Sequence, residues 1–291
     1  MKYTWIERHR DLFAISRMCR VLEVSRTGYC QWRVRTPSGR STARSVLDVQ
    51  VAALHTEHKQ RYGRPRIVQA LRSQGLHVGA EQVRQSLKRQ QLKPRYRRPY
   101  RVTTDSDHAR PIAPNVLGRR FGGWSVNEAF VGDITYIATA EGWLYLAVVM
   151  DLASRRIVGW SLSERMTADL VCQALRMAYW RRKPRPGLLM HTDRGSQYAS
   201  RAYRRLLRDY GMIQSMSRKA NCWDNSAMES FFKTLKVEQV YAVRYDTRTE
   251  ARRDLVAWME GYYNTRRLHS SIGFQTPTAW EHNAVAVAKT V

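Results

Sequence analysis

The stretch from residue 129 to residue 216 constrains the fold most, because its apolar pattern changes type halfway along. Three segments rich in β-branched and aromatic residues come first, separated by short turns, at 129–138, 143–151 and 156–163. Helix-like and strand-like segments then alternate, at 167–181, 188–191, 199–210 and 212–216. Three antiparallel strands followed by this alternation predict an α/β fold, a mixed five-stranded sheet flanked by helices.

Three acids mark one place in this predicted sheet. Asp133 stands inside the first apolar segment, where an ionised carboxylate is costly unless something positive joins it. Asp193 follows a short apolar run, so we expect it at the end of a buried strand, and we expect Glu229 on the helix after the last strand. Adjacent central strands can bring the two aspartates side by side, with the helix laying Glu229 across them.

Three carboxylates so close would repel one another unless cations neutralised them. Oxygen ligands without a His or Cys cluster favour Mg²⁺ or Mn²⁺. Two such ions, roughly 3.5 to 4 Å apart, are the arrangement used in phosphodiester chemistry. We therefore predict that Asp133, Asp193 and Glu229 are both catalytic and metal-binding.

Each acid also has a simpler interpretation. Ser226 to Glu229 can form a capping box, and Asp193 can begin a turn at 193–195. Asp133 is the hardest to explain without a function. Asp151, another acid at a strand end, is expected to serve the turn that follows it. Three further polar residues near the predicted site can equally organise their own loops: His191, Asp224 and Asn225.

The charge of the chain predicts a polyanionic partner. Lysine and arginine outnumber aspartate and glutamate by 50 to 24, and the pI is near 10.6. The excess is uneven, with 26 basic and 8 acidic residues up to residue 123. Such a charge would cost self-repulsion for no return unless it met nucleic acid. A ribosomal or merely soluble basic protein is the simpler alternative.

Two segments resembling a helix-turn-helix precede the sheet, at 1–40 and 41–92. In the first, helical spacing breaks at 23–25 and a second helix follows that Ser25 can cap, with Tyr29 and Trp32 on its packing side. In the second, one helix is expected to begin near Pro65 and another after Gly79, with Val83 and Leu87 inward. The side chains expected to meet DNA are Arg26, Arg33, Arg84 and Lys88. Plain helical hairpins remain the alternative.

Residues 93–123 are predicted to form a basic, proline-containing linker without periodicity. Its Arg95, Arg97 and Arg98, interleaved with tyrosines, can follow a phosphate backbone, although a solvated linker explains them equally well.

The cysteines and the apolar runs indicate a cytoplasmic protein. The four cysteines show no CxxC pair, which is typical of reduced thiols in the cytosol. The longest apolar run, Trp143 to Met150, is too short to span a membrane, and the N-terminus has no apolar region of signal-peptide length. We therefore expect no membrane partner.

Four motifs resemble those of a known family. In chain order they read VGDITYI, HTDRGSQYAS, NCWDNSAMESFFKTLKVE and YYNTRRLHSSIGFQTPTAWE. They are similar to the catalytic domain of bacterial transposases of the insertion sequence 3 family, relatives of retroviral integrases. The likeness runs from about Trp124 to the end, and RYGRPRI at 61–67 also resembles that family's downstream-frame product.

The resemblance implies a ribonuclease H-like catalytic domain over 124–285. It assigns the family's triad of two aspartates and a glutamate to Asp133, Asp193 and Glu229. Lys236 follows Glu229 by seven residues and would share a helix face with Lys233, beside the scissile DNA. The implied activity is metal-dependent cleavage and strand transfer at the ends of an insertion sequence.

The implied partners are double-stranded DNA, namely the terminal inverted repeats and a target. A homo-oligomer assembled on DNA is expected, associated with the bacterial nucleoid. In the family the complete transposase is often a frameshift fusion with an upstream-frame protein carrying a helix-turn-helix and a leucine zipper, which is a candidate partner here. The zinc module of retroviral integrases is absent, so zinc is not expected.

Near the C-terminus we expect a helix from Thr247, followed by a basic turn at 265–269. Arg266 and Arg267 are expected to contact DNA near the site, a solvated turn being the alternative. Two competing functions are a catalytically silent DNA-binding regulator derived from a transposase and a ribonuclease H-type nuclease acting on RNA–DNA hybrids.

Overall fold

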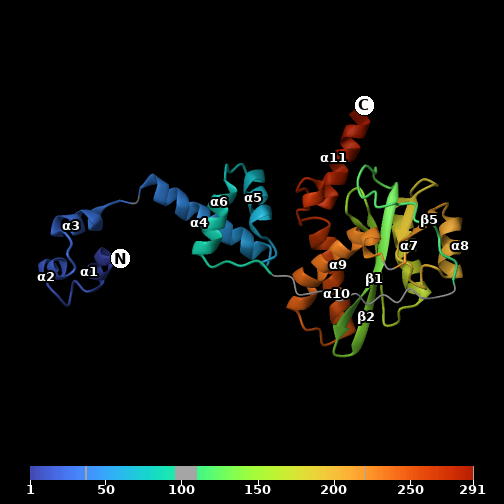
Figure 1. Ribbon diagram of the computed structural model, residues 1–291, viewed down its shortest axis with the longest axis horizontal. Coiled ribbons are helices and arrows are strands. Elements are labelled where there is room, and N and C mark those ends of the chain that lie inside the picture. The colour runs from blue at the N-terminus through green and yellow to red at the C-terminus, as the bar shows by residue number, and fades with distance from the viewer. Residues whose placement is uncertain (37, 96–109, 220, 291) are drawn as a thin grey trace. The chain divides into compact units, whose positions relative to one another are not determined.

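The computed structural model describes residues 1–36, 38–95, 110–219 and 221–290, and the chain divides into two compact units, 1–93 and 94–291 (Figure 1). The first unit is helical. Its helices are α1 (Lys2–Arg8), α2 (Ile15–Val21), α3 (Arg26–Val34), α4 (Gly39–Glu57), α5 (Arg64–Ser73) and α6 (Ala80–Arg89).

The predicted break between α2 and α3 is confirmed. Ser25 caps α3, since its Oγ accepts a hydrogen bond from the Gly28 amide at 3.3 Å. Proline stands in the first turn of α5, and Gly79 precedes α6, whose Val83 and Leu87 are buried as expected. Both features follow from the helix-start signals in the sequence.

The expectation that Tyr29 and Trp32 lie on the packing side of α3 is fully met only for Tyr29. Tyr29 is buried with Ile6, Met18 and Cys19, but the Trp32 side chain is 38% exposed. Its ring lies at the edge of this small core, 5.8 Å from the ring of Tyr3 and 6.2 Å from that of Tyr29. Three short helices bury too little surface to enclose a second large ring.

The second unit is built on one sheet. Its strands and the helices between them are β1 (Ala129–Thr139), β2 (Gly142–Asp151), β3 (Ile157–Ser163), α7 (Ala168–Arg182), β4 (Leu189–Thr192), α8 (Arg201–Asp209) and β5 (Ile213–Met216). The strand order is β3-β2-β1-β4-β5. The first three strands are antiparallel, and β4 and β5 run parallel to β1. This confirms the ribonuclease H-like mixed five-stranded sheet.

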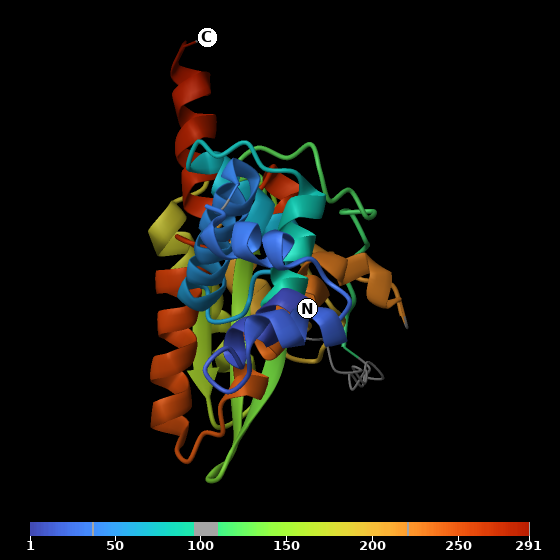
Figure 2. The same cartoon turned by 90° about the vertical axis from the view of Figure 1, so that its left-hand side faces the viewer.

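Further helices follow the sheet in the chain. They are α9 (Ser226–Glu238), α10 (Arg248–Trp258) and α11 (Pro277–Thr290), with 3₁₀ turns at Cys222–Asn225, Val240–Ala242 and Ser270–Ile272 and a π turn at Met259–Tyr263. Helices α9 and α10 cover one face of the sheet, and α7 and α8 cover the other (Figure 1). Helix α11 leads away from the sheet (Figures 1 and 2).

The described part of the chain bears on the expectations about membrane spans and cysteines. None of its helices combines the length and the apolar character that a membrane crossing requires. Cys19, Cys30 and Cys172 are free thiols, as predicted.

Gly159 on β3 lets α7 lie directly against the sheet. A Cβ added there would stand 2.2 Å from the carbonyl oxygen of Ala174 and 2.8 Å from Ala178. No side-chain rotation relieves a clash with helix backbone, so α7 would have to move off the strand.

We expect Gly159→Ala to lower the free energy of unfolding by about 1 to 3 kcal/mol, the usual cost of overpacking a core. Gly261→Ala is the matched control, because a Cβ there meets nothing within 4 Å. Urea unfolding followed by circular dichroism measures both. Equal stabilities for the two variants would contradict the close approach of α7.

Candidate active site

The alternation of strand side chains decides which way Asp133 points. On β1, Ala129, Val131 and Ile137 pack in the core under α9 and α10, whereas Phe130 packs in the core under α7 and α8. Side chains two residues apart share a face, so Asp133 points to the side of the sheet that α9 covers.

Asp193 lies beside Asp133 through strand pairing. The parallel register of β1 and β4 ends with the pair Gly132 and Thr192. Asp133 is the next residue on β1 and Asp193 directly follows β4, so the two lie near each other at the carboxyl end of β4. The Asp193 Oδ1 also accepts a hydrogen bond from the Gly195 amide at 2.9 Å. Asp193 therefore begins a turn, as the simpler interpretation predicted, and also lies beside Asp133.

Helix α9 brings Glu229 to the same face. Its apolar side chains, Met228, Phe231, Phe232 and Leu235, are buried in the core. Glu229 and Lys236 flank this stripe, seven residues apart on one side of the helix. The capping-box interpretation of Glu229 is wrong, because Ser226 is already the first helical residue and no side chain caps the helix.

Asn225 ties the start of α9 to the sheet. Its Nδ2 donates to the carbonyl oxygen of Gly132, the residue before Asp133, at 3.3 Å. The sequence left Asn225 as a residue that could organise its own loop. The contact to β1 is long-range, so no local pattern could have revealed it.

The electrostatics of Asp133 reflect this gathering of acids. Burial raises its pKa well above the usual range, and the charges of Asp193 and, more weakly, Glu229 raise it further. The Ile134 amide, which donates to Asp133 Oδ1 at 2.7 Å, and the Lys236 charge act in the opposite direction. Within the described ranges, no three acidic, His or Cys side chains stand close enough to hold one metal ion together. In this structure the three acids therefore do not converge on one metal position.

Other buried acids of this unit have arginine partners. Asp224, Glu238 and Glu281 are each at most 6% exposed. Their partners are Arg119 and Arg218 for Asp224, Arg267 for Glu238, and Arg156 and Arg182 for Glu281. Hydrogen bonds from these guanidinium groups lower the pKa of Asp224 and of Glu281 despite burial. Among the contacts that the structure describes, Asp133 has no such partner.

Asp151 serves the turn after β2, as expected. Its Oδ1 accepts hydrogen bonds from the amides of Ala153 and Ser154, both at 3.0 Å. Its Oδ2 accepts one from the Asn127 amide at 2.8 Å. A carboxylate used in this way organises the backbone.

His191 and Asp224 also have structural roles. The His191 ring shares hydrogen bonds with Ser215 Oγ at 2.8 Å and Ser217 Oγ at 3.2 Å, joining β4 to β5. Burial lowers the pKa of His191 to about 4, so the ring is neutral at pH 7. Asp224 accepts from Asn115 and from two arginines, which fixes the loop before α9.

The two lysines of α9 differ in exposure. Lys233 is exposed one turn after Glu229. Lys236 is only 8% exposed, and its Nζ lies 4.8 Å from the centroid of the Tyr136 ring. Burial lowers the pKa of Lys236, and Asp133 opposes that change.

Most of the remaining predicted DNA-binding residues are at the surface. The exposed ones are Arg26, Arg33, Arg84, Lys88 and Arg266. The Arg95 Nη1 donates to the Glu238 carbonyl oxygen at 2.8 Å. Arg97 and Arg98 lie outside the described residues. The expectation for Arg267 is not met, because its guanidinium is buried and makes a two-pronged bond to Glu238. An arginine held by a buried carboxylate cannot also reach DNA.

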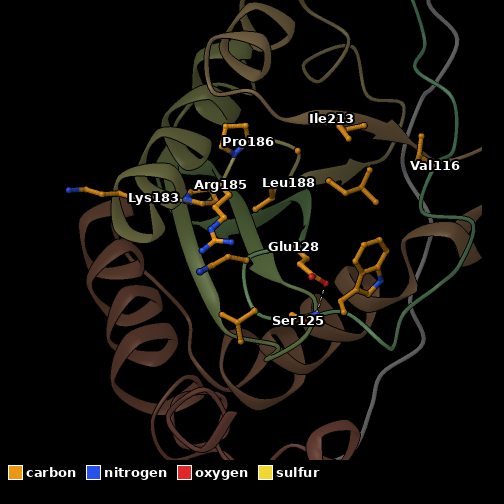
Figure 3. Close-up of a pocket in the computed structure, with 14 residues that line it drawn as sticks. Val116, Ser125, Glu128, Lys183, Arg185, Pro186, Leu188 and Ile213 are labelled. Carbon is orange, nitrogen blue, oxygen red and sulfur yellow. Dashed lines mark hydrogen bonds between the residues drawn. The ribbon is translucent and has the colours of Figure 1, made fainter. Parts of the chain in front are cut away.

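A cavity of about 720 Å³ lies away from the three acids (Figure 3). It is lined by residues before β1, such as Ser125 and Glu128, and by residues 183–189 before and at the start of β4. Asp193 follows the opposite end of β4. Within the cavity wall, the Ser125 amide donates to Glu128 Oε2 at 2.7 Å.

Known proteins match both units of the chain. Models described as "Integrase core domain" match residues 125–222 and 210–277, and one described as "HTH-like domain" matches residues 43–100. Among solved structures, the simian T-cell lymphotropic virus intasome is similar, with a TM-score of 0.45 and 16% identity over 80% of this chain and 74% of that one.

Curated relatives are much closer in sequence. The transposase InsF of insertion sequence IS3A from Escherichia coli K12 is 43% identical over 98% of this chain and 100% of the relative. The uncharacterized 31 kDa protein of insertion element IS600 from Shigella sonnei is 40% identical over 90% of this chain and 97% of the relative. The chain therefore belongs to the insertion sequence 3 family of transposases.

Proposed function

We propose that this transposase cuts and joins DNA at insertion-sequence ends with Asp133, Asp193 and Glu229 as its catalytic carboxylates. One observation carries the proposal. Asp133 is a half-buried carboxylate on the central strand β1 without an arginine partner among the described contacts, and two further acids add negative charge to it. Folding gains nothing from such an arrangement, whereas a site that collects cations requires it.

The donor set fits a hard divalent cation. Carboxylate oxygens are the ligands that Mg²⁺ and Mn²⁺ prefer. Asp133, Asp193 and Glu229 would hold two such ions, with Glu229 moving closer than it stands here. When bound, the ions supply the charge that activates an attacking oxygen and stabilises a leaving one.

The chain's own residues position the DNA around this chemistry. Asn225 holds the start of α9 on β1 and so sets how far Glu229 stands from the aspartates. Lys233, exposed beside Glu229, would contact a backbone phosphate. Water first attacks the phosphodiester and releases a 3′ hydroxyl, which then attacks a second phosphodiester. No covalent bond to the protein is needed.

Recognition of the element ends is assigned to the helical unit. The segments 1–40 and 41–92 would dock on the terminal inverted repeats through exposed side chains of α3 and α6, namely Arg26, Arg33, Arg84 and Lys88. Residues 93–123 would link these modules to the catalytic domain. Homo-oligomerisation on DNA and an upstream-frame partner complete the proposed assembly.

Asp193→Asn tests the catalytic assignment. The asparagine Oδ1 can still accept the Gly195 amide, so folding and DNA binding should persist while strand transfer falls by roughly a thousandfold or more. Asp246→Asn, on an exposed loop of the same unit, is the control and should keep full activity. Gel-based strand-transfer assays measure both. Residual transfer within about tenfold of the parent would remove Asp193 from the site.

Asp133→Asn tests the repulsion between the acids. Because folding raises the pKa of Asp133, the folded state favours a bound proton, and this acid destabilises the metal-free protein increasingly as pH rises from about 3.9 through the folded pKa. At neutral pH without metal, the variant should melt a few degrees above the parent, with the gap closing towards low pH.

Added metal should raise the melting temperature of the parent above that of Asp133→Asn. Mn²⁺ is expected to raise the melting temperature of the parent but not of Asp133→Asn, because only the parent gains from neutralising the acids. Differential scanning calorimetry with and without Mn²⁺ makes the comparison. An equal Mn²⁺ shift in both proteins would exclude Asp133 as a ligand.

A further inference from the structure

Arginines line the outward side of α8, three of them exposed and Arg204 half-buried. The four residues stand at intervals of three and four, which places them along one side of the helix: Arg201, Arg204, Arg205 and Arg208. Tyr203 and Leu207 are buried in the core and fix which side faces outward. This side belongs to the helix layer that covers the sheet face opposite α9 (Figure 1).

Helix α7 extends this surface. Arg176 of α7 lines a groove of about 1020 Å³ together with Arg201, Arg205 and Arg208. One turn after Arg176, the Trp180 side chain is 65% exposed. Arginine and tryptophan exposed together are typical of a surface that meets a macromolecule.

These arginines have weaker carboxylate partners than six other arginines of the same unit. Six arginines elsewhere lie 2.6 to 2.8 Å from a carboxylate: Arg119, Arg156, Arg181, Arg182, Arg218 and Arg267. On the groove, Arg205 to Asp209 and Arg176 to Asp169 are both 3.8 Å apart, with acids at least 58% exposed. Ion pairs so long and so exposed contribute little.

The remaining α8 arginines are less compensated still. In the part of the chain that the structure describes, Arg201, Arg204 and Arg208 have no carboxylate within ion-pair distance, and the buried Nε of Arg204 has no hydrogen-bond partner. Concentrated positive charge of this kind costs self-repulsion until a polyanion covers it.

We propose that one surface binds the phosphate backbone of duplex DNA at a site separate from the three carboxylates. This surface, called the α8 arginine surface, consists of Arg201, Arg205 and Arg208 of α8 and Arg176 of α7. The guanidinium fork matches phosphate oxygens. A rise of 1.5 Å per residue separates Arg201 from Arg208 by about 10.5 Å along the helix. That length is close to the rise of three base pairs along the axis of B-DNA, at about 3.4 Å each. The proposal rests on DNA being the substrate.

The place of α8 in the chain decides what this DNA does. Helix α8 begins eight residues after Asp193, yet lies on the other face of the sheet from Glu229. DNA on this surface is therefore held beyond the scissile phosphodiester. It is the flank of the element end or the target duplex, which share the same backbone chemistry.

The test compares two double variants. The α8 variant carries Arg205→Gln and Arg208→Gln, and the control variant carries Arg244→Gln and Arg253→Gln. All four arginines are exposed, so both variants should melt with the parent. Fluorescence anisotropy in metal-free buffer measures binding to a duplex bearing the terminal inverted repeat and to a scrambled duplex. Because no metal is present, the result does not depend on the catalytic carboxylates.

For the α8 variant we expect affinity for both duplexes to fall on the order of tenfold, and the log–log salt slope to decrease in magnitude by about 2, one unit for each lost phosphate contact. The control variant should keep the parent slope. An equal loss in the control assigns the effect to net charge and overturns the proposal.

A second measurement separates the two sources of DNA. The protein is first assembled with end DNA, and a gel shift then measures how much plasmid this complex captures, again without metal. If capture by the preassembled complex falls, the surface holds target DNA, and if affinity for the end duplex falls while capture is unchanged, the surface holds the flank of the element end. If neither changes, the proposal is overturned. An altered sedimentation coefficient in that case would identify a contact between subunits instead.

Discussion

Arginine side chains and backbone amides compensate nearly every carboxylate buried in the catalytic unit, and its architecture depends on this compensation. Glu281 of α11 accepts bonds from Arg156 before β3 and from Arg182 at the end of α7, which joins three parts of the chain at one point. Asp151 and Ser154 extend this network to the turn after β2. Removing one partner of such a group would leave an uncompensated charge in the interior, which is far costlier than the loss of a surface pair.

Asp133 contrasts with these buried acids, because it is half-buried on β1 and has no arginine partner among the described contacts. The carboxylates of Asp193 and Glu229 add to the negative charge around Asp133, and the positive charge of the buried Lys236 opposes them. Under the proposed function, cations that neutralise these acids would recover the stability lost at this point. The presence or absence of an arginine partner therefore separates the structural acids of this unit from the acid that we propose to be catalytic.

The arginines of the catalytic unit fall into two groups, those paired with buried carboxylates and those exposed on its surface. The interior arginines hold the fold together, as Arg267 does by binding Glu238. Those of α8 face outward with little compensation and are proposed to bind DNA. A count of basic residues cannot separate the two groups, since Arg267 and Arg266 are neighbours in sequence and yet one is buried and the other exposed.

The sequence by itself determined the order and type of the sheet elements, because a two-residue period and short turns are local properties. It also determined the candidate acids, because a charge inside an apolar strand is anomalous in any fold. Only the tertiary structure decided that Asn225 holds α9 to Gly132, that no capping box explains Glu229 and that Arg267 is unavailable to DNA. Burial and hydrogen-bond partners depend on which segments meet in space, and contacts between residues about 30 to 90 positions apart leave no trace in a local pattern.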